Sequence, residues 1–309
     1  MRKVFITRRL PPIAATILRE QFVVDERAVN EPCPPELLAA AVAEYDAILS
    51  TVSEKFDKTL LERRKNLRVI SNYAVGLDNI DLPYARSAGI SVYNTPDVVT
   101  NSTADLTLAL LLSLVRRLGQ AQEYVRQGLW KGWDPERCLG EDLSGKTFGI
   151  LGFGRIGQAV ARRAAAFGMS VLYYSRRESK HDVSLPYSRA QSLEELLGSA
   201  DYLSIHVPLS DETRGLVNRE MFDKMYKRPL ILNMARGEVV ATNDMIDALR
   251  VGKIRGAGLD VVSAERLSRD HALCIADNVM VVPHIGTATV ECRYDMATVA
   301  ARNILRHFQ

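Results

Sequence analysis

Three glycines in the second half of the chain have the spacing that binds a dinucleotide. Gly152, Gly154 and Gly157 form a G-x-G-x-x-G pattern between the apolar run 148–151, typical of a strand, and helical periodicity over 155–167. The first glycine permits a tight turn, the second lets the backbone approach a pyrophosphate, and the third lets helix and strand pack closely. The N–H groups at the helix start would then hold the phosphates. The alternative is a glycine-rich turn that binds nothing.

The residues after the next predicted strand favour NADP(H) over NAD(H). In NAD-binding proteins an acidic residue about 20 positions beyond the glycines accepts a hydrogen bond from the ribose 2′-OH. Here Ser175 stands 21 positions after Gly154, and Arg176 and Arg177 follow it. An acid would repel a 2′-phosphate, whereas serine and arginine can bond it. The alternative is that both arginines are solvated loop residues beside an NAD site.

Charged side chains stand where three further predicted strands end. Arg236 follows one strand, Asp260 and Glu265 lie at and beyond the end of another, and His284 follows the last. Ligands of α/β sheets bind at the carboxyl ends of the strands. Taken singly, each has an ordinary alternative. Arg236 could form a surface ion pair, Glu265 could be a solvated loop acid, and His284 could be a capping residue. An arginine, a glutamate and a histidine in this order after a dinucleotide fold indicate a catalytic site.

The elements that would position these residues alternate between strand and helix, which predicts an α/β fold built on parallel sheets. With 309 residues, two domains are expected. Strands are predicted at 4–6, 23–24, 47–49, 69–71, 91–92, 148–151, 171–174, 202–206, 230–233, 258–261 and 279–282. Helices are predicted at 12–20, 35–42, 82–88, 100–118, 155–167, 193–197, 219–224, 243–250 and 288–307.

The glycine turn opens the second domain, so we expect the last helix to return to the first. Residues 1–99 plus 288–309 would form a substrate-binding (catalytic) domain, and residues 100–287 a dinucleotide-binding Rossmann domain. The apolar helix at 100–118 would suit a junction between domains or subunits. The segment 119–145 is expected to be irregular, and a loop of that length is usually functional or part of an interface.

Composition excludes several classes of protein. The net charge of +3 indicates no nucleic-acid partner. The cysteines Cys33, Cys138, Cys274 and Cys292 have no C-x-x-C spacing, so we expect free thiols in a reducing compartment and no metal site. The first residues are charged with only a short apolar run, and no stretch is long enough to span a membrane. We therefore expect a cytoplasmic protein without a membrane partner.

Taken together, the motifs resemble the D-isomer-specific 2-hydroxyacid dehydrogenase family over essentially the whole chain. Within that family the chain is most similar to glyoxylate and hydroxypyruvate reductases. The resemblance implies two Rossmann-like or flavodoxin-like parallel-sheet domains with an active-site cleft between them. The motifs that carry it, besides the glycine turn, lie at 72–81, 94–96, 206–209, 233–237, 258–261 and 283–289.

The resemblance also implies roles for the charged residues. Arg236 would bind the carboxylate and the carbonyl oxygen of a 2-oxo acid. His284 would be the general acid that protonates the carbonyl oxygen, and Glu265 would orient its imidazole and favour the protonated form. Backbone N–H groups of Val75 and Gly76 would hold the substrate carboxylate.

Further contacts follow from the same resemblance. Asp260 would accept a hydrogen bond from the nicotinamide carboxamide, and Thr103 and Pro208 would line the cofactor. Trp133 would approach the active site of a partner subunit and contact substrate there. The implied cofactor-binding residues are Thr103, Gly152, Phe153, Gly154, Arg155, Ile156, Gly157, Ser175, Arg176, Arg177, His206, Val207, Pro208, Thr213, Met234, Ala235, Arg236, Asp260, His284 and Gly286.

The sequence therefore predicts an NADPH-preferring reductase, able to use NAD(H) as well, that converts glyoxylate or hydroxypyruvate to glycolate or D-glycerate. We expect a homodimer built on the helix 100–118 and the loop after it. One alternative is another D-2-hydroxyacid dehydrogenase, of the D-lactate or phosphoglycerate type. Another is a dinucleotide-sensing binding protein like the corepressors that share the fold. Formate dehydrogenases are disfavoured because they carry Gln where Glu265 stands.

Overall fold

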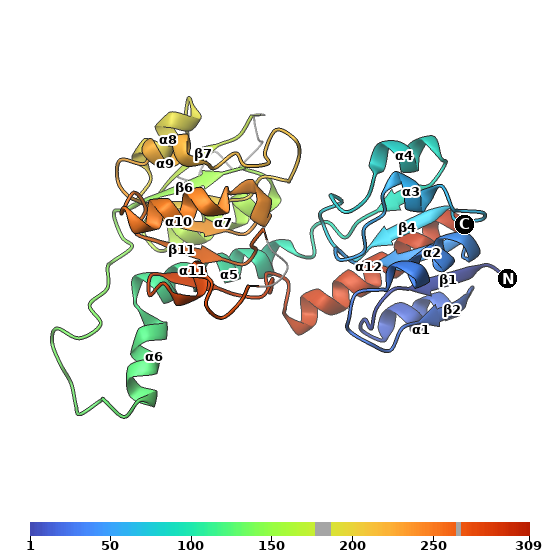
Figure 1. The fold of residues 1–309 in the computed structure, drawn as a ribbon, viewed down its shortest axis with the longest axis horizontal. Coiled ribbons are helices and arrows are strands. Elements are labelled where there is room, and N and C mark those ends of the chain that lie inside the picture. Colours follow the sequence, from blue (N-terminus) through green and yellow to red (C-terminus); the bar gives the residue numbers. More distant parts are fainter. Residues whose placement is uncertain (177–186, 264–266) are drawn as a thin grey trace. The chain divides into compact units, whose positions relative to one another are not determined.

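The computed structural model describes residues 1–176, 187–263 and 267–309. The chain forms two compact units (Figure 1). Unit 1 comprises Met1–Val99 and Thr287–Gln309, and unit 2 comprises Thr100–Gly286. Each unit is built on one parallel sheet, as the alternation of strand and helix predicted.

Unit 1 has a five-stranded sheet in the order β2-β1-β3-β4-β5. This is the doubly wound order of flavodoxin-like folds. The central strand β3 is buried along its whole length, as expected for a parallel sheet covered on both faces. The strands are β1 (Lys3–Ile6), β2 (Val23–Glu26), β3 (Ala47–Ser50), β4 (Val69–Asn72) and β5 (Ser91–Tyr93).

Helices cover the sheet of unit 1, and the last helix of the chain packs against α1 and β4. Short polar side chains start several of the helices: Asp57 caps α3, Asp81 caps α4 and Thr289 caps α12, each accepting a hydrogen bond from a backbone N–H. The helices are α1 (Ile13–Arg19), α2 (Pro35–Glu44), α3 (Lys58–Leu61), α4 (Leu82–Ser87) and α12 (Val290–Phe308).

Unit 2 has a seven-stranded parallel sheet in the order β12-β11-β10-β9-β6-β7-β8. The chain enters at β6, runs to one side through β7 and β8, and returns to run outward from β9 to β12, which is the Rossmann arrangement. The strands are β6 (Thr147–Leu151), β7 (Ser170–Tyr174), β8 (Tyr187–Arg189), β9 (Tyr202–Ile205), β10 (Leu230–Asn233), β11 (Gly256–Leu259) and β12 (Val279–Val281).

Apolar side chains of unit 2 form one core on each face of the sheet. Ile150 and Leu151, successive residues of β6, belong to different cores because neighbouring residues of a strand point to opposite faces. The helices α5 (Thr100–Val115) and α7 (Arg155–Ala166) pack together over one face. The other core holds side chains from α8 (Leu193–Ser199), α9 (Arg219–Asp223) and α10 (Thr242–Arg250). A short helix, α11 (Ala272–Ile275), packs beside β12.

Two local predictions were wrong. The long helix ends at Val115 rather than at 118, because Arg117 adopts a left-handed conformation (φ +52°) that breaks it. The following segment, predicted to be irregular, begins with a second helix, α6 (Leu118–Arg126). The short edge strand β8 was not predicted either. None of the helices described is long and apolar enough to cross a membrane.

Candidate active site

The predicted site residues of unit 2 share one edge of its sheet. All seven strands are parallel, so their carboxyl ends lie at the same edge. The strand order reverses beside β6 and β9, and ligands of open α/β sheets bind at such a reversal. Following the strands from β12 to β7, the residues after their carboxyl ends include His284, Asp260, Arg236, His206, Gly152 and Ser175.

The three glycines have three different environments. Gly152 has φ +96°, and a Cβ there would lie 2.8 Å from the carbonyl carbon and oxygen of His206. A Cβ on Gly157 would lie 2.3 Å from the Gly152 carbonyl oxygen, so this residue packs helix α7 against the turn. A Cβ on Gly154 would meet no atom within 4 Å. The space beside Gly154, at the N-terminus of α7, is therefore open, which is what a pyrophosphate requires.

The side chains between the glycines differ in their exposure. Phe153 is buried and stacks on Tyr173 with ring centroids 3.7 Å apart, so only its backbone can face a cofactor. Ile156 packs against the core of unit 2. Arg155 is exposed in the first turn of α7. Of these predicted cofactor contacts, the structure leaves the side chain of Arg155 accessible.

The predicted 2′-phosphate site already holds a network of charges. Arg176 is exposed and forms an ion pair with Glu212. The carbonyl oxygen of Ser175 accepts a hydrogen bond of 3.1 Å from Nη2 of Arg189 in β8. Sequence reasoning identified neither Glu212 nor Arg189. Arg177 lies outside the described residues.

His206 has an unusual environment at the end of β9. Its Nε2 lies 2.7 Å from the hydroxyl of Ser204, and its Nδ1 is buried with no hydrogen-bond partner in the described parts of the chain. Burial lowers the pKa of His206 to about 3, so the imidazole is neutral at ordinary pH. A buried polar atom without a partner is a group that a bound ligand can satisfy.

The loop after His206 is organised by Thr213. Its hydroxyl donates to the carbonyl oxygen of Pro208 at 2.6 Å and accepts from the N–H of Ser210 at 2.8 Å. Thr213 is buried, whereas Pro208 is exposed and Val207 half-buried. The structure thus gives Thr213 a role in shaping the loop, and Pro208 and Val207 provide the accessible surface.

Arg236 is held by one hydrogen bond to its backbone and one from its side chain. Its carbonyl oxygen accepts from Nδ2 of Asn233 at 2.9 Å, and its own Nη1 donates to the carbonyl oxygen of Ala235 at 2.9 Å. A Cβ on Gly237 would lie 1.9 Å from the carbonyl carbon of Val262, so the loops after β10 and β11 are in close contact. Met234 and Ala235 are buried. Glu265, the predicted partner of His284, lies outside the described residues.

His284 is exposed and left-handed, with φ +53°. Asp260, only 3% exposed, holds this turn. Its two carboxylate oxygens accept from the N–H groups of Ile285 at 2.6 Å and Gly286 at 3.0 Å, and its carbonyl oxygen accepts from the N–H of His284 at 3.0 Å. Asp260 therefore positions the turn of His284, a role that sequence reasoning did not assign.

The start of α5 completes this corner of unit 2. The hydroxyl of Ser102 donates to the carbonyl oxygen of Gly286 at 2.8 Å. A Cβ on Gly286 would lie 3.5 Å from Thr103, which is itself buried. Thr103 is thus beside the turn that carries His284, but little of its side chain is accessible.

The predicted carboxylate contacts of unit 1 follow β4. The carbonyl oxygens of Val75 and Gly76 accept from Nδ2 of Asn94 at 2.8 Å and of Asn72 at 3.0 Å. Within the described chain, the N–H groups of Val75 and Gly76 have no acceptor. Two neighbouring free N–H groups can bind an anion.

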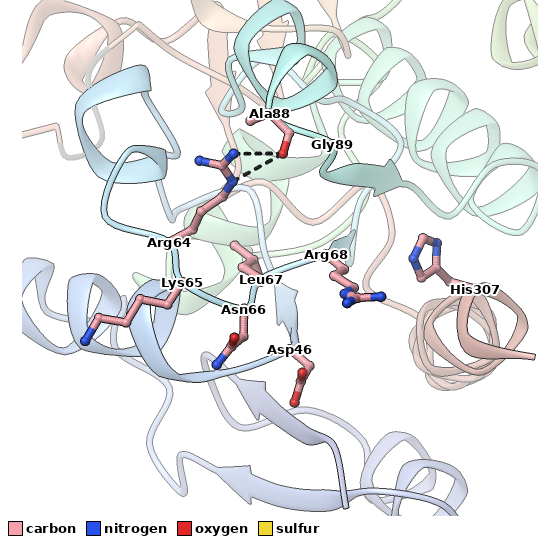
Figure 2. A pocket seen from close by; sticks show the side chains of 9 residues that line it. All are labelled: Asp46, Arg64, Lys65, Asn66, Leu67, Arg68, Ala88, Gly89 and His307. Atoms are coloured by element: carbon pink, nitrogen blue, oxygen red, sulfur yellow. Dashed lines mark hydrogen bonds between the residues drawn. The ribbon is translucent and has the colours of Figure 1, made fainter.

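A cavity of about 480 Å³ in unit 1 lies at the other edge of the sheet (Figure 2). Asp46 and Arg68, which line it, directly precede β3 and β4. Arg64 already donates two hydrogen bonds, of 3.2 and 3.0 Å, to the carbonyl oxygen of Ala88. Lys65 points away from Arg68 in Figure 2, so the cations do not converge on one point. This cavity is therefore not the candidate active site.

Comparisons with known proteins identify the family of the chain. Residues 108–286 match the family described as D-isomer specific 2-hydroxyacid dehydrogenase, NAD binding domain. The glyoxylate reductases of Pyrococcus horikoshii and Pyrococcus furiosus are 43% and 44% identical to this chain, each over 98% of it and 92% and 91% of their own length.

Solved structures are similar over the same length. A protein of Thermus thermophilus is 45% identical with a TM-score of 0.91, covering 98% of this chain and 96% of its own. An NADPH-dependent glyoxylate/hydroxypyruvate reductase of Sinorhizobium meliloti, in complex with NADP and malonate, is 31% identical with a TM-score of 0.89, covering 100% of this chain and 94% of its own. The protein belongs to the D-isomer specific 2-hydroxyacid dehydrogenase family. It is an oxidoreductase that acts between 2-oxo acids and 2-hydroxy acids.

Proposed function

We propose that the protein reduces small 2-oxo acids, glyoxylate first and hydroxypyruvate second, with NADPH as the preferred hydride donor. The observation that carries the substrate class is the similarity to glyoxylate reductases, which extends over 98% of this chain at 43% identity. The polar edge of the unit 2 sheet supports the same conclusion, because Arg236 follows β10 and His284 follows β12 at the same edge, with β11 between these two strands.

Substrate binding rests on charge and geometry. A 2-oxo acid presents a carboxylate beside a carbonyl oxygen, and the planar fork of Arg236 can bond both. The free N–H groups of Val75 and Gly76 would add donors to the carboxylate. Nothing in this set requires a metal ion. Fixed donors of this kind also stabilise the charge that develops on the carbonyl oxygen during reduction.

Proton transfer is assigned to His284, with Glu265 as its partner. The bound nicotinamide supplies the hydride, and the protein must deliver a proton to the carbonyl oxygen. His284 is exposed at the site edge, whereas burial keeps His206 uncharged at neutral pH. Of the two histidines, His284 is therefore the one suited to act as a charged general acid. Asp260 supports it by holding the backbone turn.

The cofactor preference rests on Ser175 and Arg176. The residue after β7 has no charge and the next is a cation, so the end of this strand offers a 2′-phosphate a donor and a positive charge. The neutral His206, whose Nδ1 has no hydrogen-bond partner among the described residues, adds a polar contact near the strand reversal.

A turnover assay tests this function. Glyoxylate, hydroxypyruvate and pyruvate would each be assayed with NADPH and with NADH, and we expect the highest kcat/KM for glyoxylate with NADPH. Arg236→Lys should lower kcat/KM for glyoxylate at least about tenfold, equivalent to about 1.4 kcal/mol, while the Kd for NADPH is unchanged. Tight dinucleotide binding without turnover of any 2-oxo acid would instead indicate a sensing protein.

We also infer a homodimer. In Figure 1, α6 and the chain after it extend away from the sheet of unit 2. Trp133 in this segment is 88% exposed, and clustered exposed apolar side chains mark an interaction surface. The exposed apolar residues of this segment are Leu118, Val125, Leu129, Trp130, Trp133 and Leu139. Sedimentation of the wild type and of Leu118→Glu, which places a charge in this apolar segment, tests the homodimer. The wild type should sediment as a dimer and the variant as a monomer.

A further inference from the structure

The loop after β9 places a carboxylate at the predicted ribose site. Glu212 in this loop forms an ion pair with Arg176, which follows β7. The two strands lie on either side of β6, so the pair connects the two loops that flank the glycine turn. The side chains are 70% and 66% exposed, and both can be reached by a ligand from solvent.

Glu212 lies in a loop that is held by hydrogen bonds. Its neighbours Ser210 and Thr213 form a closed turn, in which the N–H of Thr213 donates to the Ser210 carbonyl oxygen at 3.1 Å and the N–H of Ser210 donates to the Thr213 hydroxyl at 2.8 Å. The chain therefore presents Glu212 from a structured turn. Asp211, the preceding acid, is exposed, and its carboxylate has no contact among the described residues.

A second cation belongs to the same cluster. Arg189 of β8 lies opposite Tyr173 in the sheet and donates to the carbonyl oxygen of Ser175. Ser175 is thus flanked by Arg176 in the chain and by Arg189 across the sheet. The ribose site combines two cations that favour a phosphate with one carboxylate that opposes it.

We propose that Glu212 is a specificity-determining residue that restrains the preference for NADPH over NADH. It competes with the 2′-phosphate for Arg176, and for NADH it supplies the acceptor for the ribose 2′-OH that Ser175 replaces at the strand end. An exposed ion pair is weak, so the phosphate can displace the carboxylate at little cost. This inference rests on the proposed function, because it places the adenosine ribose beside Ser175.

The test is a comparison of Kd values for NADPH and NADH in four variants. Glu212→Gln keeps the shape of the side chain and removes its charge. It should strengthen NADPH binding about fivefold and weaken NADH binding, in keeping with the free energy of an exposed ion pair. The matched control is Asp211→Asn, which removes the neighbouring charge and should shift both cofactors by the same small factor.

The Arg176→Ala background identifies the cause. If Glu212 acts by occupying Arg176, adding Glu212→Gln to Arg176→Ala should give a much smaller gain in NADPH affinity. Equal shifts for both cofactors in Glu212→Gln, or a shift equal to that of Asp211→Asn, would overturn the inference. Failure of the proposed cofactor preference looks different: the wild type would bind NADH more tightly, while the contrast between the two acid variants would still be measured.

Discussion

The two units share a doubly wound parallel sheet but differ at the point where the strand order reverses. In unit 1 the reversal lies between β1 and β3, and the carboxyl group of Glu54 occupies it. Glu54 is 2% exposed and accepts from the hydroxyl of Thr7 at 3.1 Å, the N–H and hydroxyl of Thr51 at 2.8 Å each, and the N–H of Cys33 at 3.2 Å. In unit 2 the corresponding edge has open space beside Gly154.

The sheet topology places backbone and side-chain donors at the carboxyl edge of each sheet. The residues of the loops at that edge determine which acceptor these donors bind. Unit 1 satisfies the donors after β1 and β3 with its own carboxylate. Its first connection, from Thr7 to Pro12, contains prolines and no glycine, and α1 begins without a side-chain cap. Unit 2 uses glycines at the same place and leaves the start of α7 accessible. A phosphate site therefore belongs to unit 2.

The largest expected effect concerns the chemistry at the edge of unit 2. His284→Asn removes the general acid but suits the left-handed backbone, which Asn tolerates. We expect kcat for glyoxylate to fall about a thousandfold, within the range of a lost general acid. NADPH affinity should be unchanged, as measured by fluorescence titration. A loss below tenfold would mean that another group delivers the proton.

The next effect concerns the internal carboxylate of unit 1. Glu54→Ala would leave buried donors unsatisfied, so we expect a loss of about 3 kcal/mol in the stability of unit 1 toward urea. Glu54→Gln keeps one acceptor oxygen and should lose less. NADPH affinity should not change in either variant. If Glu54→Ala were as stable as the wild type, the Glu54 carboxylate would not be needed to satisfy the donors after β1 and β3.

A pair of glycine variants separates folding from cofactor binding in unit 2. Gly152→Ala should destabilise the fold, because the backbone is left-handed and the added carbon would lie 2.8 Å from His206. Gly154→Ala has ordinary φ and open space, so its stability should be retained. Its Kd for NADPH should rise about tenfold, because the added methyl group would occupy the space that the pyrophosphate needs. Unchanged NADPH binding in Gly154→Ala would place the pyrophosphate elsewhere.

Local patterns were enough to predict much of the fold. The strands β6, β9 and β10 are mostly apolar, and the glycine spacing identified the turn before α7. The family and the class of reaction followed from motifs spread along the chain, and the comparisons confirm both. Sequence therefore predicts well those features that depend on neighbouring residues in the chain.

Features that depend on distant residues were missed. The pairing of Glu212 with Arg176 joins two loops 36 positions apart, and Glu54 meets Thr7 47 positions away. Neither acid lies in a sequence motif that indicates the residue with which it interacts. Helix α6 has no buried residue, and it was missed because the glycines in 119–145 indicated an irregular segment. Asp260 was identified, but its hydrogen bonds to Ile285 and Gly286 depend on how two strand ends meet.

The smallest effect concerns His206, the half-buried histidine beside the strand reversal. Burial lowers its pKa from the ordinary 6.5 to about 3 in the folded protein. Between these values the unfolded chain binds a proton that the folded chain does not, so stability rises with pH in this window and is lost as pH falls from 6.5 toward 3.

His206→Gln should remove this dependence. On going from pH 7.5 to 6.0 the wild type should lose about 0.8 kcal/mol more stability than the variant, measured by urea unfolding at each pH. Because His206 is neutral throughout this range, the pH profile of glyoxylate reduction at saturating cofactor should keep its alkaline limb in the variant. Parallel stability curves would show that His206 has an ordinary pKa in the folded protein. A shifted alkaline limb would mean that His206 shares the proton transfer with His284.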